Sequence, residues 1–263
     1  YTDDNGAVWF KSTDFGDDKD RVLVKMNGEY TYFASDVAYT WDKFQRVDYE
    51  INIWGADHHG YVKRVQSVAE AFGHKGKYEI LLGQLVNLLR NGEPVRMSKR
   101  RGTMIGFEEL LDEVGADATR YTLISRSSNQ TIDFDVEAVK QKSNANPVYY
   151  VQYAHARICS ILRRAAGVTT QEAHALGMDE VARCAVYDLS LLTHESEASL
   201  ARKVSEFPEL IAGCARDRAP FRITHFCEEL AGAYHAFYGN CQVLSSAGHP
   251  VDEALSKARL AVC

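Results

Sequence analysis

Basic residues are too few in this sequence of 263 residues for a protein that binds nucleic acid through its overall charge. Lysine and arginine total 30 against 36 aspartate and glutamate, which gives a formal net charge of −6, and both halves of the chain are acidic. This balance excludes a bulk, nonspecific nucleic-acid binder, so any RNA contact must come from a local patch. Internal repeats and low-complexity segments are also absent.

Metal-binding cysteine motifs and long apolar runs are lacking as well. None of the six cysteines, at 159, 184, 214, 227, 241 and 263, forms a Cys-x-x-Cys pair. We therefore expect no zinc and no other protein metal site, but buried free thiols in a reducing cytosol. No apolar run is long enough to span a bilayer, so we expect no membrane partner. What is present, 46% hydrophobic and 25% charged residues, is typical of a globular protein.

The first part of the chain has the pattern of an α/β fold. Residues 7–33 are rich in strand formers and contain the hairpin signal Asn27-Gly28, after which Ser35 is the expected cap of a helix. The next expected elements are a strand at 51–54, a helix at about 61–72 and a strand at 80–82. Strand, helix and strand in this order predict a parallel sheet with a crossover helix.

The pattern becomes helical beyond residue 107. One helix is expected at 107–114, and Asp117 is the expected cap of the next. No strand signal is found after Pro147, and Asn144–Pro147 is the natural boundary, because the residue before a proline resists helix. Further helices are expected at 148–166, 180–200, 203–215 and 223–244. The fold class is therefore α/β followed by all-α, with domains at 1–142 and 143–263.

The most specific motif is Arg-Met-Ser-Lys-Arg-Arg-Gly at residues 96–102. A basic surface turn is the alternative, but Met-Ser-Lys-Arg arises by chance in only about one chain in several hundred. A loop with these residues can fold over a triphosphate. Lys99 and Arg100 supply positive charge, and Ser98 supplies a hydrogen-bond donor.

A second motif is Gly-Ala-Asp-His-His at residues 55–59, which follows an expected strand. Ligands of open α/β sheets bind at the carboxyl ends of strands. There Gly55 lets a nucleotide approach the backbone, and Asp57 can accept hydrogen bonds from ribose hydroxyls. A metal site or an Asp-His-His phosphoesterase are the alternatives. The loop at 96–102, about forty residues later, favours a nucleotide site.

A third segment contains Tyr32 and Asp36 near an expected helix start. The carboxylate of Asp36 can simply complement the helix dipole, and for this segment alone we prefer that interpretation. Alternatively, Asp36 binds a cation such as a guanidinium bidentately, with Tyr32 beside it.

Four segments together resemble bacterial arginyl-tRNA synthetases, a family of class I aminoacyl-tRNA synthetases. They are Tyr-Thr-Tyr-Phe-Ala-Ser-Asp-Val-Ala-Tyr at 30–39, Ile-Asn-Ile-Trp-Gly-Ala-Asp-His-His-Gly-Tyr at 51–61, Gly-Glu-Pro-Val-Arg-Met-Ser-Lys-Arg-Arg-Gly at 92–102, and Asn-Pro-Val-Tyr-Tyr-Val-Gln-Tyr-Ala-His-Ala-Arg at 146–157. Their order and spacing are those of the family, and the similarity covers nearly the whole chain. The third includes the family's KMSKS-type signature, here Arg-Met-Ser-Lys-Arg.

The resemblance implies a role for each candidate residue. In the family, the signature lysine, here Lys99, stabilises the transition state as the carboxylate of the amino acid attacks the α-phosphorus of ATP. We expect Ser98 and Arg100 to act with Lys99. The expected ATP and adenylate contacts are Gly55, Asp57, His58, Met97 and Lys99. The arginine contacts implied by the family are Tyr32, Asp36 and His58.

The helix expected after Pro147 has two stripes. Tyr149, Tyr153, Arg157 and Arg164 fall on one face, and we expect them to bind tRNA, because aromatic rings and guanidinium groups stack on unpaired bases. The opposite stripe is apolar. The alternative, in which the tyrosines belong to the core and the arginines are solvated, is about equally good from the sequence.

The resemblance also implies the parent activity and its limits. The parent enzyme is expected to join L-arginine to tRNA(Arg) through arginyl-adenylate, with ATP and Mg²⁺, releasing AMP and pyrophosphate, as a cytoplasmic monomer. The family's His-x-Gly-His element and tRNA-elbow domain have no counterpart here, and the sequence stops within the expected last helices. We therefore expect 1–142 to be the second half of a Rossmann-like catalytic domain and 143–263 a truncated anticodon-binding helical bundle, inactive in ATP–pyrophosphate exchange by itself.

Two other functions remain open from the sequence. One is a non-catalytic tRNA-binding protein descended from a synthetase. The other is a different class I synthetase such as the cysteine enzyme, which shares the signature loop and a helical domain but needs a zinc site.

Overall fold

The computed structural model describes residues 1–95, 106–176 and 187–263. Two compact units are found, one formed by residues 1–86 with 128–132 and the other by residues 87–127 with 133–263. The compact units thus divide near residue 86, so the domain boundary at 142/143 stays a prediction. Among the described residues, no helix has the length and apolar character needed to cross a membrane.

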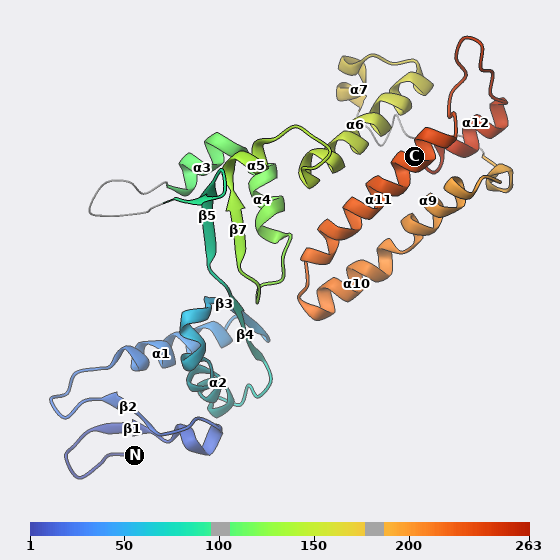
Figure 1. Cartoon of the computed structure of the whole chain (residues 1–263). Coiled ribbons are helices and arrows are strands. Elements are labelled where there is room, and N and C mark those ends of the chain that lie inside the picture. The colour runs from blue at the N-terminus through green and yellow to red at the C-terminus, as the bar shows by residue number, and fades with distance from the viewer. Residues whose placement is uncertain (96–105, 177–186) are drawn as a thin grey trace. The chain divides into compact units, whose positions relative to one another are not determined.

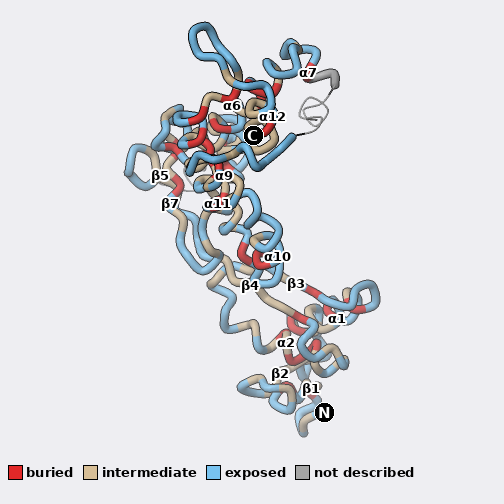
Figure 2. Tube along the Cα trace, turned by 90° about the vertical axis from the view of Figure 1, so that its right-hand side faces the viewer, coloured by how far each residue is buried: buried red, intermediate tan, exposed pale blue. Residues whose placement is uncertain are grey.

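The first unit is built on the expected strand–helix–strand arrangement. Strand β3 (Glu50–Gly55) pairs in parallel with β4 (Tyr78–Gly83), and α2 (Val62–Ala71) connects them. Buried positions of α2, red in Figure 2, include Val65 and Ala69, which pack with Phe44 and Tyr78 in a small core. The predicted parallel pair with its crossover helix is confirmed.

The start of the first unit differs from the expected hairpin. Strand β1 (Val8–Phe10) pairs antiparallel with β2 (Arg21–Val24), and a short 3₁₀ helix, η1 (Ser12–Phe15), lies between them. Beyond the Asn27-Gly28 turn, only Tyr30 forms a bridge back to β2, at Val24.

Helix α1 (Tyr32–Phe44) begins three residues before the cap that the sequence suggested, so Ser35 is not the cap. The Oγ1 of Thr31 accepts the N–H of Ala34 and donates to the carbonyl of Val22, which starts the helix at the end of the turn. Tyr32 is therefore helical rather than in a strand. Because residues four apart share a helix face, Tyr32 and Asp36 lie on the same side of α1.

The second unit opens with three strands that the sequence analysis missed. Strands β5 (Val86–Arg90), β6 (Glu93–Pro94) and β7 (Ile132–Asp135) form a sheet in the order β6-β5-β7. These strands are short, and their polar residues obscure the alternation of apolar and polar positions that indicates a strand. The side chain of Asp135 joins them: it accepts the N–H groups of Asn91 and Gly92 and caps α5 (Val136–Lys140).

Two helices precede β7. Helix α3 (Phe107–Val114) has the predicted bounds. Helix α4 (Ala116–Ile124) begins directly after Gly115, whose φ of 91° only glycine adopts readily. Asp117 therefore lies in the first turn and is not the cap that the sequence suggested.

The rest of the second unit is helical, as expected. Its elements are α6 (Pro147–Ala166), α7 (Thr170–Leu176), η4 (Leu189–Leu191), α9 (Glu195–Ser205), α10 (Phe207–Asp217), α11 (Phe221–Asn240) and α12 (Glu253–Leu260). Figure 1 shows α9 and α11 running side by side. The Asn146 side chain accepts the N–H of Val148, and Pro147 occupies the first turn, so the helix expected at 148–166 begins close to its predicted start.

Three helix ranges were misplaced. The one expected at 203–215 is divided at Glu206, where α9 ends and α10 begins. In the described part of the helix expected at 180–200, helical structure begins at Glu195. His194 and Glu197 form a capping box at this start. Residues 177–186 lie outside the described residues. The helix expected at 223–244 ends at Asn240, and Cys241 is already extended.

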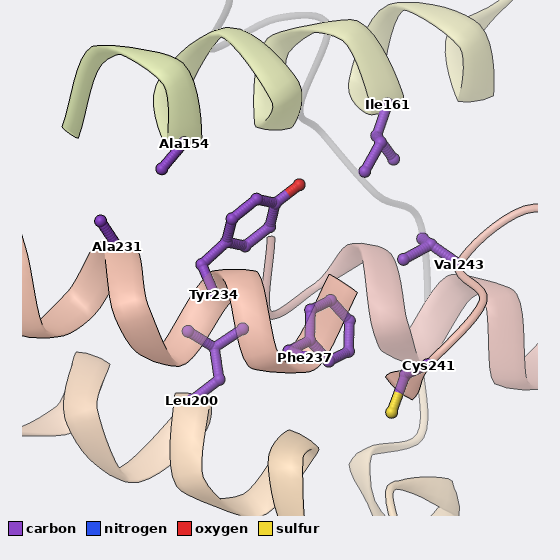
Figure 3. Close-up of a cluster of buried hydrophobic side chains, with 8 residues drawn as sticks. All are labelled: Ala154, Ile161, Leu200, Ala231, Tyr234, Phe237, Cys241 and Val243. Atoms are coloured by element: carbon purple, nitrogen blue, oxygen red, sulfur yellow. The ribbon is translucent and has the colours of Figure 1, made fainter. Parts of the chain in front are cut away.

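The main core of the second unit lies between α6, α9 and α11. Figure 3 shows Tyr234 and Phe237 of α11 between side chains of the other two helices, with Leu200 on one side and Ala154 on the other. Tyr234 and Phe237 are 1% and 0% exposed. The expectation of buried thiols is met in part: Cys159, Cys214 and Cys241 are buried, whereas Cys227 and Cys263 are half-buried. Cys184 lies outside the described residues.

Candidate functional site

A pocket of about 580 Å³ lies in the first unit, where β3 ends beside α1. Its lining residues come from α1, β3 and the 3₁₀ helix η2 (Ala56–Tyr61), and they are Tyr32, Asp36, Ile53, Trp54, Gly55, His58 and Tyr61. The structure thus brings together four residues that the sequence analysis selected from two separate segments: Tyr32, Asp36, Gly55 and His58.

Asp36 supplies the negative charge of this pocket. Its Oδ2 accepts a hydrogen bond of 2.8 Å from the phenol of Tyr61, and Trp54 lies beside that ring at 6.3 Å between centroids. Burial raises the pKa of Tyr61 above its ordinary value, and the hydrogen bond to Asp36 adds to the effect. Tyr61 is therefore a neutral donor, which orients the carboxylate without cancelling its charge.

The nearby cations are engaged elsewhere. The Nζ of Lys43 lies 2.5 Å from Glu50 and 3.1 Å from the Oδ1 of Asn52, and the guanidinium of Arg64 stacks on the Tyr61 ring at 4.2 Å. Among the described residues, Asp36 has no ion-pair partner. A carboxylate that lies beside aromatic rings and has no cationic partner favours a cationic ligand. A guanidinium fits it in charge and in planar shape.

Two glycines meet at the strand end beside the pocket. Gly55 of β3 is paired with Gly83 of β4, which the sequence analysis did not select. A Cβ on Gly55 would come within 2.5 Å of Oδ1 of Asp57, so Asp57 folds back over this glycine. Asp57 does not line the pocket, and it lies 3.6 Å from His58 with both side chains exposed.

The signature residues Met97, Ser98, Lys99 and Arg100 lie outside the described residues. The elements on either side of that segment are linked by charge. Arg90 of β5 lies 2.7 Å from Glu113 of α3, and Lys140 of α5 lies 3.0 Å from the same carboxylate. These hydrogen bonds, chiefly that from Arg90, lower the pKa of Glu113 to about 2. β5, which precedes the signature segment in sequence, and α3, which follows it, are therefore joined.

The predicted RNA stripe on α6 forms a stack of side chains. The rings of Tyr149 and Tyr153 lie 6.0 Å apart and nearly parallel, and the guanidinium of Arg157 lies 4.5 Å from the Tyr153 ring. Arg157 also donates to the Tyr153 hydroxyl at 2.6 Å, and it covers the ring of Tyr238 from α11 at 4.6 Å. We call Tyr149, Tyr153, Arg157 and Tyr238 the α6–α11 ladder.

The ladder has a member that spacing along α6 could not reveal. Tyr238 belongs to α11, and its 39% exposed ring joins the stripe only after the two helices pack together. Among the described residues, no cation–π contact joins Arg164 to the stack, but Arg164 lines a pocket together with Tyr238. Tyr149, Tyr153 and Arg157 are half-buried, so they are neither core residues nor fully solvated.

His235 lies beneath the ladder and predicts a pH dependence of stability. Burial, with Arg157 adding to it, lowers its pKa below the ordinary value of 6.5. At pH values just below 6.5, His235 is protonated in the unfolded chain but stays neutral in the folded chain. The free energy of unfolding therefore falls as the pH drops through 6.5. We expect the melting temperature to fall from pH 7 to pH 5.5 through this residue.

The measurement is thermal unfolding at both pH values with two variants of α11. His235→Phe keeps an aromatic ring against Tyr150 and Tyr153 but cannot titrate, so its decrease should be smaller. His225→Phe, at an exposed position of the same helix, should behave like the unchanged chain. Equal decreases in all three proteins would contradict the assignment.

Among the described residues, no group of three or more His, Cys, Asp or Glu side chains is placed to hold a metal ion. The adjacent histidines His58 and His59 are both exposed in η2.

Comparison with known protein families gives a match in the helical part of the chain. Residues 151–263 match the family model of the DALR anticodon binding domain. This range includes α6 from its second turn onward and all of the bundle core described above.

Curated relatives are similar over nearly the whole chain. Arginine–tRNA ligase 1 of Halalkalibacterium halodurans is 46% identical over 260 residues, covering 98% of this chain and 44% of the relative. Arginine–tRNA ligase of Oleidesulfovibrio alaskensis is 48% identical over 263 residues, covering 99% of this chain and 45% of the relative. The chain thus spans less than half the length of these two relatives.

Solved structures agree with this similarity. A putative arginyl-tRNA synthetase from Campylobacter jejuni superposes on 100% of this chain and 55% of its own, with a TM-score of 0.77 and 31% identity. The arginyl-tRNA synthetase of Thermus thermophilus has a TM-score of 0.74 at 20% identity, covering 97% of this chain and 50% of its own, and this match concerns the fold only.

Proposed function

We propose that this chain, which is 46–48% identical to arginine–tRNA ligases over nearly its whole length, forms the arginine-binding and tRNA-binding part of an arginine–tRNA ligase. The complete ligase forms arginyl-adenylate from L-arginine and ATP with Mg²⁺, and it releases pyrophosphate. It then transfers the arginyl group to tRNA(Arg) and releases AMP. As the family resemblance implies, it acts as a cytoplasmic monomer.

The observation that carries this proposal is the pocket around Asp36. A carboxylate without a cationic partner among the described residues lines a cavity with Tyr32, Trp54 and Tyr61. In this proposal, Asp36 pairs with the guanidinium of arginine, Tyr32 packs beside it, and His58 contacts the same substrate. An uncharged or acidic side chain would leave the Asp36 charge desolvated and unpaired, which is unfavourable.

The ATP side of the site combines the strand end with the signature segment. We assign Gly55 and Asp57 to the nucleotide, because Gly55 lines the pocket at the strand end and the Asp57 carboxylate lies directly against it. The resemblance assigns Lys99, with Ser98, Arg100 and Met97, to the triphosphate. Residues 1–142 then make up the second half of a Rossmann-like catalytic domain.

The helical part supplies the RNA contact. We assign residues 143–263 to an anticodon-binding bundle, which the DALR match over 151–263 supports. The exposed edge of the α6–α11 ladder offers aromatic rings and a guanidinium for stacking with unpaired bases.

The test is amino-acid-dependent ATP–pyrophosphate exchange by the complete ligase in the presence of tRNA(Arg). We expect exchange with arginine and a rate at least about a hundredfold lower with ornithine, lysine, citrulline or cysteine, because none pairs bidentately with Asp36. Exchange with cysteine would favour a different class I synthetase. Tight tRNA binding without any exchange would favour a non-catalytic tRNA-binding protein.

A further inference from the structure

Asp36 lines two cavities of the first unit. One is the pocket described above, and the other is a smaller cavity of about 280 Å³ between α1, α2, β3 and β4, which we call the α1–β3 cavity. Lys43 is the only basic residue among the described residues that line this cavity. A carboxylate and an ammonium group thus border the same small space without forming an ion pair with each other.

The geometry of α1 places Lys43 within reach of Asp36. The two residues are seven positions apart, which is nearly two helical turns, so they share a face and are separated by about 10 Å along the helix. Side chains of a helix tilt toward its N-terminus, and this tilt directs Lys43 back toward Asp36. The Nζ of Lys43 already lies 4.1 Å from the centroid of the Tyr39 ring, and Tyr39 is the residue one turn closer to Asp36.

Two side chains of β3 hold the ammonium group away from Asp36. The Oε1 of Glu50 lies 2.5 Å from the Nζ of Lys43, and the Oδ1 of Asn52 accepts a hydrogen bond from the same group at 3.1 Å. Glu50 and Asn52 are two positions apart in the strand and therefore lie on the same face. Asn52 is itself oriented, because its Nδ2 donates to the hydroxyl of Tyr78 on β4. Lys43 is thus bound to the strand.

Stability alone does not explain an acidic residue at position 50. The Glu50 side chain is 6% exposed, and its second carboxylate oxygen, Oε2, is buried without a hydrogen-bond partner among the described residues. A buried, unsatisfied carboxylate oxygen costs free energy, and a buried ion pair is often no more stable than an apolar pair of similar volume. The effect of Glu50 on the position of Lys43 is a reason for its charge that stability does not supply.

We propose that Glu50 is a positioning residue of the arginine site, which keeps Lys43 from neutralising Asp36. While Glu50 holds the ammonium group, the Asp36 carboxylate stays available to a cationic substrate. Without the Glu50 charge, Lys43 turns toward Asp36, the carboxylate that borders the same cavity, and competes with the guanidinium of arginine. This inference rests on the proposed function and explains how a site beside a lysine stays anionic.

The experiment measures arginine-dependent ATP–pyrophosphate exchange by the complete ligase at saturating ATP and tRNA(Arg). Glu50→Gln keeps the size of the side chain and removes its charge. If Lys43 then occupies Asp36 for about nine-tenths of the time, the KM for arginine rises about tenfold, and kcat stays nearly unchanged. Glu70→Gln is the matched control, because Glu70 of α2 pairs with the exposed Lys75, and it should leave the KM unchanged.

Two double variants distinguish competition by Lys43 from damage to the sheet. Glu50→Gln with Lys43→Met removes the competing cation. Glu50→Gln with Asn52→Asp gives Lys43 a new carboxylate on the same face of the strand. Both should return the KM to within about twofold of the unchanged enzyme, because the effects of residues in contact are not additive. A purely structural role of Glu50 predicts the reverse, since each double variant changes the same contacts a second time.

A milder substitution keeps the test decisive if Glu50→Gln does not fold. Glu50→Asp retains the charge but shortens the side chain by one methylene group, which loosens its hold on Lys43. It should raise the KM for arginine about threefold, and Lys43→Met should again remove the increase. Melting temperatures are measured for every variant, and we expect the KM to follow the charge near Asp36 instead of the melting temperature.

The inference and the proposed function fail in different ways. If Asp36→Asn raises the KM for arginine and the Glu50 substitutions do not, the arginine pocket stands and the role of Glu50 is overturned. The role of Glu50 is also overturned if either double variant keeps the raised KM. If Asp36→Asn leaves the KM unchanged, or the ligase shows no exchange with arginine, the proposed function fails and this inference fails with it.

Discussion

Replacing Asp36 by asparagine in the complete ligase is expected to raise the KM for arginine by roughly 30- to 1000-fold, while kcat falls much less. Asparagine keeps the shape of the side chain and can still accept the phenol of Tyr61. It loses the charge that pairs with the guanidinium and places an N–H₂ group against that cation. The expected loss of about 2–4 kcal/mol is that of a charge-assisted, bidentate contact.

Asp42→Asn is the matched control, because Asp42 lies on the same helix and pairs with Arg46 in solvent with both side chains exposed. It should leave the KM for arginine unchanged, since exposed ion pairs contribute little. Equal effects of the two substitutions would mean that α1 responds to lost charge in general, and an unchanged KM for Asp36→Asn would leave Asp36 as a helix-dipole residue.

Tyr61→Phe tests how Asp36 is held. The ring stays against Trp54 and under Arg64, and only the 2.8 Å hydrogen bond to Asp36 is removed. Because the carboxylate keeps its charge but loses its orientation, we expect the KM for arginine to rise by roughly three- to tenfold with kcat nearly unchanged. A fall in kcat alone would show that Tyr61 acts on the chemical step instead of on binding.

The difference between Asp36 and Tyr61 illustrates what the sequence could predict about the site. Asp36 lies in a segment whose family resemblance assigns it to the substrate. Tyr61 ends another such segment, but the contact joins residues 25 positions apart and depends on how α1 packs beside β3. In the same way, Tyr238 joins the ladder only through the packing of α11 on α6. Residue roles that depend on tertiary contacts left no local signal.

The elements of the fold were likewise predicted from the sequence only in part. Apolar segments with regular periodicity, such as β3, α2, α3 and α6, were predicted because burial determines both their pattern and their structure. The start of α1 was missed, because a threonine that bonds to Val22 nine residues earlier competes with Ser35 as the cap. Strands β5 to β7 were missed because they are held partly by the Asp135 side chain, whose partners are more than forty residues away.

Lys99→Ala in the complete ligase is expected to lower kcat for adenylate formation by at least about a hundredfold, with little change in equilibrium tRNA affinity. The resemblance assigns Lys99 to the charge that develops on the triphosphate as pyrophosphate departs. Removing one preorganised charge contact has an effect of this size in other enzymes. Single-turnover measurement of adenylate formation at saturating arginine, ATP and tRNA isolates the step.

Arg157→Ala should have the opposite profile. It removes the guanidinium that lies between Tyr153 and Tyr238, so tRNA binding should weaken by about ten- to a hundredfold and lose part of its salt dependence. Arg163→Ala on the same helix is the control and should bind tRNA normally. Because the resemblance implies that arginine is activated only with tRNA bound, both substitutions must be compared at saturating tRNA, where Arg157→Ala should regain the full rate. If it binds tRNA normally yet stays slow there, the ladder is not an RNA contact, and the division of labour between the signature loop and the helical bundle is wrong.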